Sequence, residues 1–125
     1  MFLVDTNVFL EILLKQDRSE ISKNFLDSNI GSLSITDFSL HSIGVILFKY
    51  GKRDVLEKFI EDILPYIRLV SLPIELYSEI AATGNKLQLD FDDAYQYCIA
   101  RYYGLRIVTM DNDFRSVEDV EILFL

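Results

Sequence analysis

Five short apolar runs, most of them separated by amphipathic helical stretches, are the feature that most constrains the fold of this chain. The runs that we expect to be strands are residues 1–4, 33–35, 67–71, 106–109 and 121–125. Strands that are joined by helical crossovers pair in parallel, and strands that are apolar on both sides suit a sheet covered on both faces. The pattern therefore predicts an α/β fold, a three-layer α/β/α sandwich with a central parallel sheet of about five strands.

The length and composition predict one domain. The chain has 125 residues, half of them hydrophobic and only two of them proline, which excludes a disordered or fibrous chain. No internal repeat and no linker rich in Gly, Ser or Pro divides it. We therefore expect residues 1–125 to form a single domain.

Features of membrane and exported proteins are missing from the sequence. No apolar run approaches the roughly 20 residues that span a bilayer. Residues 2–4 are followed at once by Asp5, without a basic n-region, and the single cysteine, Cys98, cannot form an internal disulfide. These observations predict a cytoplasmic protein.

Acidic residues follow two of the expected strands and begin one helix. Asp5 comes directly after residues 1–4, Asp111 and Asp113 follow residues 106–109, and Asp92 and Asp93 lie at the start of the helix before that strand. Ligands of parallel sheets gather beyond the carboxyl ends of the strands, so these acids converge if the first and fourth strands are neighbours. Several carboxylates repel one another unless a cation lies between them. Oxygen ligands without a His/Cys pair favour Mg²⁺ or Mn²⁺ over Zn²⁺.

The net charge of −8 argues against a broad basic face that grips nucleic acid. It does not exclude an enzyme that meets phosphates through bound metal ions. Purely structural roles for the same acids also stay open. Asp5 and Asp90 suit helix N-caps, Asp92 and Asp93 suit a first helical turn, and residues 111–113 suit a polar turn.

Three segments resemble the PIN domain family. Residues 1–8, Met-Phe-Leu-Val-Asp-Thr-Asn-Val, are similar to the family's first strand, which ends in an Asp-Thr-Asn or Asp-Ser-Asn signature. Asp92-Asp93-Ala94 resembles its segment in which an Asp-Ala pair begins a helix, and residues 107–114 are similar to its Thr-x-Asp-x-Asp-Phe segment. The resemblance covers the whole chain in the right order, and the family's fold agrees with the one predicted above.

The resemblance implies a ribonuclease that uses Mg²⁺ or Mn²⁺ to hydrolyse RNA phosphodiester bonds. Many small PIN domains are VapC-like toxins of type II toxin–antitoxin pairs, so it also implies a small antitoxin partner and a homodimer. Carried over by motif, the metal ligands and catalytic residues are Asp5, Asp93, Asp111 and Asp113. Residues implied to support the site are Thr6, Asn7, Asp92 and Thr109.

One position departs from the family pattern. The family's second acid is usually a Glu early in the helix after the second strand, and here that position falls on or beside Ser42. Asp37, one helical turn earlier, is a candidate substitute and also suits an N-cap, while His41 is a candidate ligand or phosphate contact. The departure leaves a second interpretation open, a catalytically degenerate PIN domain that binds RNA or a protein.

Two further groups have a structural and a functional interpretation. Tyr95, Tyr97, Tyr102 and Tyr103 share one expected helix, where core packing competes with stacking on bases. A modest basic cluster suits a solvated helix face or an RNA backbone contact; its members are Lys49, Lys52, Arg53 and Lys58. A phosphoacceptor domain of the receiver type is disfavoured, because no Lys follows the fourth strand in a comparable position.

Overall fold

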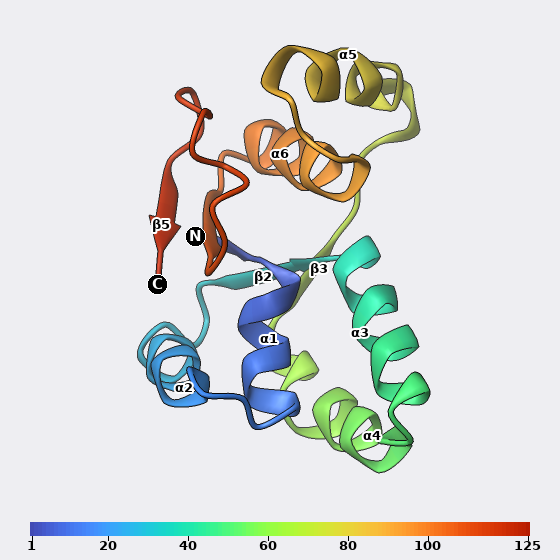
Figure 1. Ribbon diagram of the computed structural model, residues 1–125, viewed down its shortest axis with the longest axis vertical. Helices are drawn as coiled ribbons and strands as arrows, with labels where there is room; N and C mark the ends of the chain where they lie inside the picture. Colours follow the sequence, from blue (N-terminus) through green and yellow to red (C-terminus); the bar gives the residue numbers. More distant parts are fainter.

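The computed structural model describes residues 1–125 and contains a parallel five-stranded sheet between two layers of helices (Figure 1). The strands are β1 (Phe2–Val4), β2 (Leu33–Thr36), β3 (Arg68–Val70), β4 (Arg106–Thr109) and β5 (Ile122–Phe124), in the sheet order β3-β2-β1-β4-β5. The helices are α1 (Thr6–Leu13), α2 (Ser19–Ser28), α3 (Asp37–Lys49), α4 (Arg53–Asp62), α5 (Ser78–Leu87) and α6 (Phe91–Tyr103). The predicted three-layer α/β/α architecture is confirmed.

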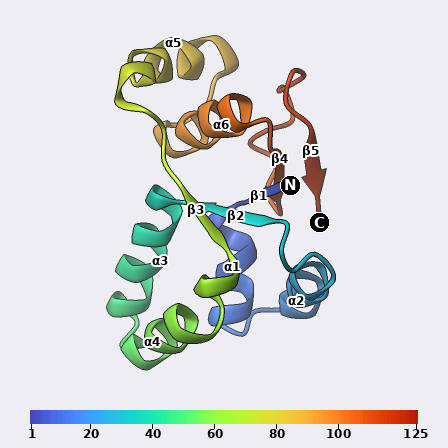
Figure 2. The ribbon, with the colours of Figure 1, turned by 180° about the vertical axis from the view of Figure 1, so that it is seen from behind.

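Each face of the sheet has its own apolar core. Helices α5 and α6 cover one face and α1 to α4 cover the other, as the front and back views both show (Figures 1 and 2). Alternate residues of β1 point to opposite faces, so Leu3 packs in the core beneath α5 and α6 while Phe2 and Val4 pack in the core against α1 to α4. Burial on both faces explains why the strands are continuous apolar runs.

Of the two prolines, Pro73 precedes a helix start, as the sequence pattern predicts, whereas Pro65 lies inside a short helix that the pattern did not predict. The pattern predicts that Pro65 stops the fourth helix, but α4 ends earlier and Pro65 lies inside a short 3₁₀ helix, η1 (Leu64–Tyr66). The helix predicted to open at Pro73 begins as a second 3₁₀ turn, η2 (Ile74–Leu76), before α5. Proline is tolerated in a first turn because its missing N–H would have no helical partner there.

The connection from β4 to β5 crosses between parallel strands without a helix. Residues 110–121 form turns and bends, and three of their apolar side chains, Phe114, Val117 and Val120, are buried in the core beneath α5 and α6. This buried anchor fixes the loop that carries Asp111 and Asp113. No helix of the structure is both long enough and apolar enough to cross a membrane.

Candidate metal centre

The candidate site begins at the centre of the sheet, where β1 and β4 end side by side. Val4 lies opposite Val108, so the predicted neighbourhood of the first and fourth strands is confirmed. Asp5 follows β1 and caps α1, and its side chain accepts a hydrogen bond from the Thr6 N–H (2.8 Å). The other carboxylate oxygen accepts from the Thr109 hydroxyl (2.7 Å). Asp5 is therefore a helix cap and at the same time a fixed, buried carboxylate at the predicted site.

Burial raises the pKa of Asp5. Only 7% of the residue is exposed, and desolvation, with the negative charge of Asp111 adding to it, raises the pKa from 3.8 to about 6. The hydrogen bonds from Thr109 and Thr6 act in the opposite direction and limit the shift. A carboxylate held in this way is stabilised further by any cation that approaches it.

Asp93 is contributed to the site by α6, which belongs to the other helical layer. It lies in the first turn of α6 and is also 7% exposed. Desolvation raises its pKa from 3.8 to about 8, and a hydrogen bond with Asp113 and the charges of Asp92, Asp113 and Asp5 add to this shift. The Asp93 carboxyl is therefore harder to ionise than an ordinary aspartate near neutral pH.

The loop after β4 orients the remaining two acids. The Asn7 side-chain amide donates to Asp111 Oδ2 (2.9 Å), and the Asp111 N–H donates to the Thr109 hydroxyl (3.2 Å). The Asp113 N–H donates to Asp111 Oδ1 (3.1 Å), which is the polar turn expected as an alternative for this segment. The turn and the site are thus the same structure, since the hydrogen bonds that form the turn also fix Asp111.

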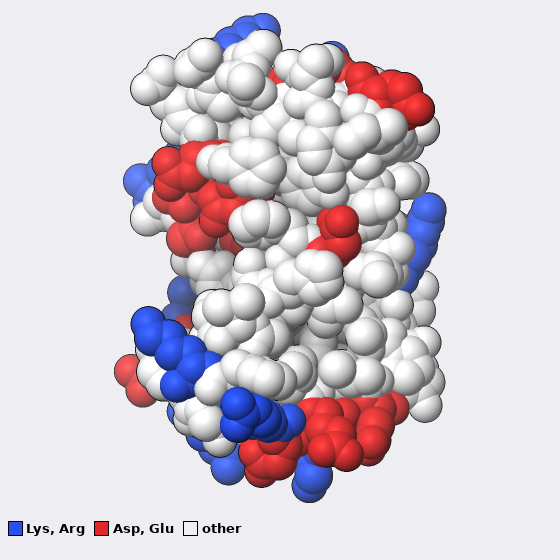
Figure 3. Space-filling model, turned by 90° about the vertical axis from the view of Figure 1, so that its right-hand side faces the viewer, with Lys and Arg blue, Asp and Glu red and all other residues white.

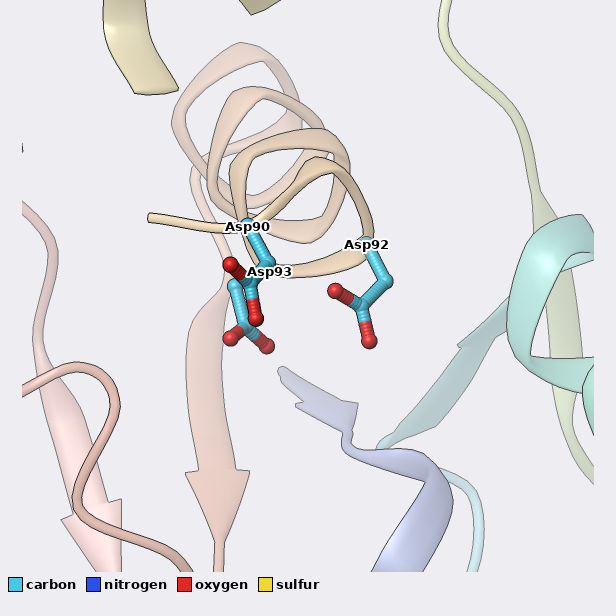
Figure 4. A group of neighbouring side chains, drawn as sticks. All are labelled: Asp90, Asp92 and Asp93. Atoms are coloured by element: carbon cyan, nitrogen blue, oxygen red, sulfur yellow. The ribbon is translucent and has the colours of Figure 1, made fainter. Parts of the chain in front are cut away.

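Three acids at the start of α6 form a compact group, drawn in Figure 4. One side-chain oxygen from each of Asp90, Asp92 and Asp93 lies within 4.8 Å of the others. Asp90 occupies the N-cap position, but its side chain makes no capping hydrogen bond, whereas Asp92 and Asp93 lie in the first turn, where negative charge favours the helix dipole. Asp92 is exposed at the edge of the site next to the buried Asp93.

No basic side chain neutralises these carboxylates. The one salt bridge of the structure joins Arg106 to Glu121 (3.7 Å), and neither residue belongs to the acidic group. The basic cluster at α3 and α4 includes Lys49, Arg53 and Lys58, which are all exposed, and Arg53 lies over the ring of Phe48. The charge of the site is therefore not balanced by the protein itself.

The candidate site residues of α3 make other contacts than the acids of the site do. Asp37 is not the N-cap that one interpretation predicted; Thr36 is, and its hydroxyl accepts from the Ser39 N–H. Asp37 accepts a hydrogen bond from the Tyr95 hydroxyl (2.8 Å).

His41 is exposed and lines an apolar groove between α3 and α4, and Ser42 is half-buried on the same helix. The structure therefore places neither side chain among the hydrogen bonds of the acidic group.

Two polar residues of the site, Ser39 and Gln96, were not predicted from the sequence. Ser39 accepts from the Thr6 hydroxyl (2.8 Å) and ties α1 to α3. Gln96 is 3% exposed, its side chain lies against Asp5, and its Oε1 has no hydrogen-bond partner. The signal for Gln96 was its spacing, because a residue three positions after Asp93 lies on the same face of a helix.

The sequence left open whether the four tyrosines of α6 pack in the core or stack on bases, and burial answers this for two of them. Tyr95 and Tyr97 are buried, so core packing is correct for them, whereas Tyr102 is exposed. The Tyr97 hydroxyl donates to Asp119, and the Tyr95 hydroxyl donates to Asp37.

Comparison with known proteins agrees with this arrangement. The PIN domain family model matches residues 2–120. The crystal structure of FitAcB from Neisseria gonorrhoeae is similar with a TM-score of 0.71 and 26% identity, covering 98% of this chain and 96% of that chain. A toxin–antitoxin complex from Klebsiella pneumoniae has a TM-score of 0.77 at 20% identity, covering 96% and 95%.

Mycobacterium tuberculosis VapC20, described as a toxin that cleaves the sarcin-ricin loop, has a TM-score of 0.78 at 16% identity, with 97% of this chain and 98% of that chain covered. No curated protein matches the chain in sequence. The family match spans nearly the whole chain, and the fold agrees with it over the same residues. This chain therefore belongs to the PIN domain family.

Proposed function

We propose that this protein is a metal-dependent ribonuclease that hydrolyses RNA phosphodiester bonds. The observation that carries the proposal is the convergence of two buried carboxylates, Asp5 and Asp93, with Asp111 and Asp113 and without a basic partner. Burial of like charges is costly unless a cation or a proton compensates them. A site of this kind is suited to hold a divalent cation beside an RNA phosphate.

The donor set fits Mg²⁺ or Mn²⁺. All four acids offer oxygen ligands, which these hard cations prefer. Asp93 also belongs to the compact group with Asp90 and Asp92 at the start of α6, which contains no His or Cys. The Gln96 side chain lies against Asp5, and its Oε1 is buried without a hydrogen-bond partner. Buried oxygens normally have a partner, so this oxygen is a further candidate ligand for a cation. We assign Asp5, Asp93, Asp111 and Asp113 as the metal-holding and catalytic residues.

The protein's own groups prepare the site. Thr109 and the Thr6 N–H fix both oxygens of Asp5, and Asn7 fixes one oxygen of Asp111, so neither carboxylate has to reorient when a ligand arrives. Because burial raises the pKa of Asp93 to about 8, a cation held by this carboxylate would bind in competition with its proton. When bound, the cation polarises the phosphodiester and lowers the pKa of the attacking water.

The proposed biological role is the toxin of a type II pair. The similar structures from Klebsiella pneumoniae and Mycobacterium tuberculosis are described as a toxin–antitoxin complex and as an RNA-cleaving toxin, which supports this role and a small antitoxin partner. We also propose a homodimer. Its support is an apolar groove of about 640 Å³ between α3 and α4, beside the exposed Val45 and Phe48.

A degenerate, non-catalytic PIN domain is the second candidate function. The observation that favours it is the hydrogen bond by which Tyr95 holds Asp37, the candidate substitute acid, while Ser42 stands at or beside the family's usual Glu position. On this interpretation the site has lost one negative charge and metal affinity falls.

Calorimetric titration of Mn²⁺ into the metal-free protein distinguishes the two functions without a known substrate. We expect binding that disappears in Asp5→Asn and persists in Asp54→Asn, a matched control at an exposed acid in the first turn of α4. Asp93→Asn should then abolish RNA cleavage and keep the fold. Absence of Mn²⁺ binding up to millimolar concentration would favour the degenerate domain, and full cleavage by Asp93→Asn would remove this site assignment.

A further inference from the structure

Gln96 of α6 is a buried amide of which one atom is left without a partner. The residue is 3% exposed, and its Oε1 is shielded from solvent and accepts no hydrogen bond. The one other buried side-chain atom in this state is the Ser34 hydroxyl. A buried polar atom without a partner costs about 1–3 kcal/mol, a cost that an apolar residue at this position would avoid. The amide therefore needs an explanation.

The contact with Asp5 fixes which way the amide points. A hydrogen bond from the Gln96 side chain lowers the pKa of Asp5, as an N–H that donates to a carboxylate does. The opposite orientation would place the amide oxygen against an ionised carboxylate, two acceptors with no proton between them. Nε2 therefore faces Asp5, and Oε1 is the free atom. Because both atoms are bonded to the same carbon, Oε1 lies close to this carboxylate as well.

The same helix face carries Asp93. Gln96 follows Asp93 by three positions, so both side chains project from one side of α6. The acids at the start of α6 point toward the end of β1 in Figure 4, and the charge of Asp5 raises the pKa of Asp93. The unpaired oxygen is therefore among the groups that we propose to hold the cation.

A neutral ligand suits a site whose carboxylates have no basic partner. On the face of the molecule that carries α3, acidic atoms reach the surface in the middle among mostly uncharged atoms, whereas Lys and Arg atoms lie at the margins and in the lower part (Figure 3). One more carboxylate would add to the repulsion between Asp5 and Asp93 in the metal-free protein. An amide oxygen is also a ligand that hard cations accept, and it adds no charge.

We propose that Gln96 Oε1 is a direct ligand of the divalent cation and takes over the role of the acid that α3 lacks. This inference rests on the proposed metal-dependent function and adds to it a ligand that the motifs do not supply. The family's usual Glu position falls on or beside Ser42, so the replacement comes from α6 instead and is neutral. The site keeps an oxygen ligand but has one negative charge fewer, so it binds the cation less tightly than a site with a carboxylate at this position.

Two variants of Gln96 test the assignment by calorimetric titration with Mn²⁺. Gln96→Met keeps an unbranched side chain of similar length but removes the oxygen, so the affinity should fall about 10- to 100-fold. Gln96→Glu keeps the oxygen and adds a charge, so the affinity should rise roughly 10-fold. The matched control is Gln16→Met, at an exposed glutamine after α1, which should bind like the wild type.

The direction of the change in Gln96→Glu separates a ligand from a positioning residue. If Gln96 acts only by donating to Asp5, an ionised glutamate cannot donate and repels Asp5, so Gln96→Glu should then bind Mn²⁺ more weakly than the wild type. A ligand predicts the opposite sign.

A spectroscopic measurement on the wild type needs no variant that folds. The chain has three glutamines, Gln16, Gln88 and Gln96, of which the first two are exposed. Electron–nuclear double resonance of Mn²⁺ bound to protein labelled with ¹³C at the glutamine side-chain carbonyl should show a resolved coupling to one glutamine. The coupling should be absent from Gln96→Met at saturating Mn²⁺ and present in Gln16→Met.

The outcomes separate the Gln96 ligand from the proposed function. A resolved coupling, with weaker binding by Gln96→Met and tighter binding by Gln96→Glu, supports the ligand. A wild type that binds Mn²⁺ without a coupling overturns it and leaves the four acids as the metal site. Wild-type affinity in both variants, or weaker binding by Gln96→Glu, also overturns it. A wild type that binds no Mn²⁺ up to millimolar concentration contradicts the metal-dependent function itself, and the Gln96 ligand with it.

Discussion

Replacing Asp93 with asparagine should make the metal-free protein more stable at pH 8. The pKa of this buried carboxyl is about 8 in the folded protein, against 3.8 for an ordinary aspartate. Between these two values the folded chain holds a proton that the unfolded chain has lost, so the free energy of unfolding falls as the pH rises from about 4 to 8. Each pKa unit corresponds to about 1.36 kcal/mol, so the full cost at pH 8 is on the order of 5 kcal/mol.

Asparagine removes this cost because its amide carries no charge at any pH and still donates a hydrogen bond to Asp113. We therefore expect Asp93→Asn to raise the free energy of unfolding by several kcal/mol at pH 8 and to change it little at pH 4. Urea denaturation in the presence of a chelator measures both values. Asp92→Asn is the matched control, because Asp92 is exposed in the same helical turn and its loss should cost only about 0.3–1 kcal/mol through the helix dipole.

Saturating Mn²⁺ should narrow the difference in stability at pH 8 by about half. The wild type gains about 2.7 kcal/mol when the free cation is at 100 times its dissociation constant, and Asp93→Asn gains nothing if Asp93 is the ligand we propose. The reasoning is refuted if Asp93→Asn is no more stable than the wild type at pH 8 without metal, or if its gain is as large at pH 4.

Three further predictions follow from single contacts. Thr109→Val removes the 2.7 Å hydrogen bond to Asp5, so Mn²⁺ affinity measured by calorimetry should fall about 10- to 100-fold; unchanged affinity would show that the bond does not orient this carboxylate. Tyr95→Phe leaves Asp37 without its buried donor and should lower the free energy of unfolding by about 1–3 kcal/mol in urea denaturation, and an unchanged value would show that this hydrogen bond does not stabilise the fold. Val45→Glu places a charge beside the α3–α4 groove and should convert the proposed homodimer to monomers in analytical ultracentrifugation; a variant that stays dimeric excludes this surface as the interface.

The sequence predicted the layers of the fold and most of the acidic site for the same physical reason. Strands buried on both faces must be apolar throughout, and such runs followed by Asp5 or Asp111 place the acids at one edge of the sheet. The motif order of the PIN family agreed with this placement, and the sheet order then confirmed that β1 and β4 are neighbours. These features depend on local pattern and on a general rule of parallel sheets.

The contacts that cross between layers could not be predicted from local pattern. Tyr95 and Asp37 are far apart in the chain and meet only because α6 and α3 approach from opposite faces of the sheet. In the sequence, Gln96 is an ordinary polar residue of a helix, and only the structure shows that it is buried against Asp5. The end of the fourth helix was also misjudged, because α4 ends at Asp62 and Pro65 lies inside η1, whereas the helix start predicted at Pro73 is confirmed.

The central position of β1 has a consequence for the order in which the molecule assembles. Its hydrogen-bonded neighbour β4 follows about a hundred residues later, and the contact that fixes Asp5 comes from Thr109. A chain emerging from the ribosome can form the helices α1 to α4 early, because their contacts are local, but it cannot close the sheet until β4 has been made. The acidic centre is thus absent from every nascent chain that ends before residue 113, and any activity that depends on it begins only after that residue has been made.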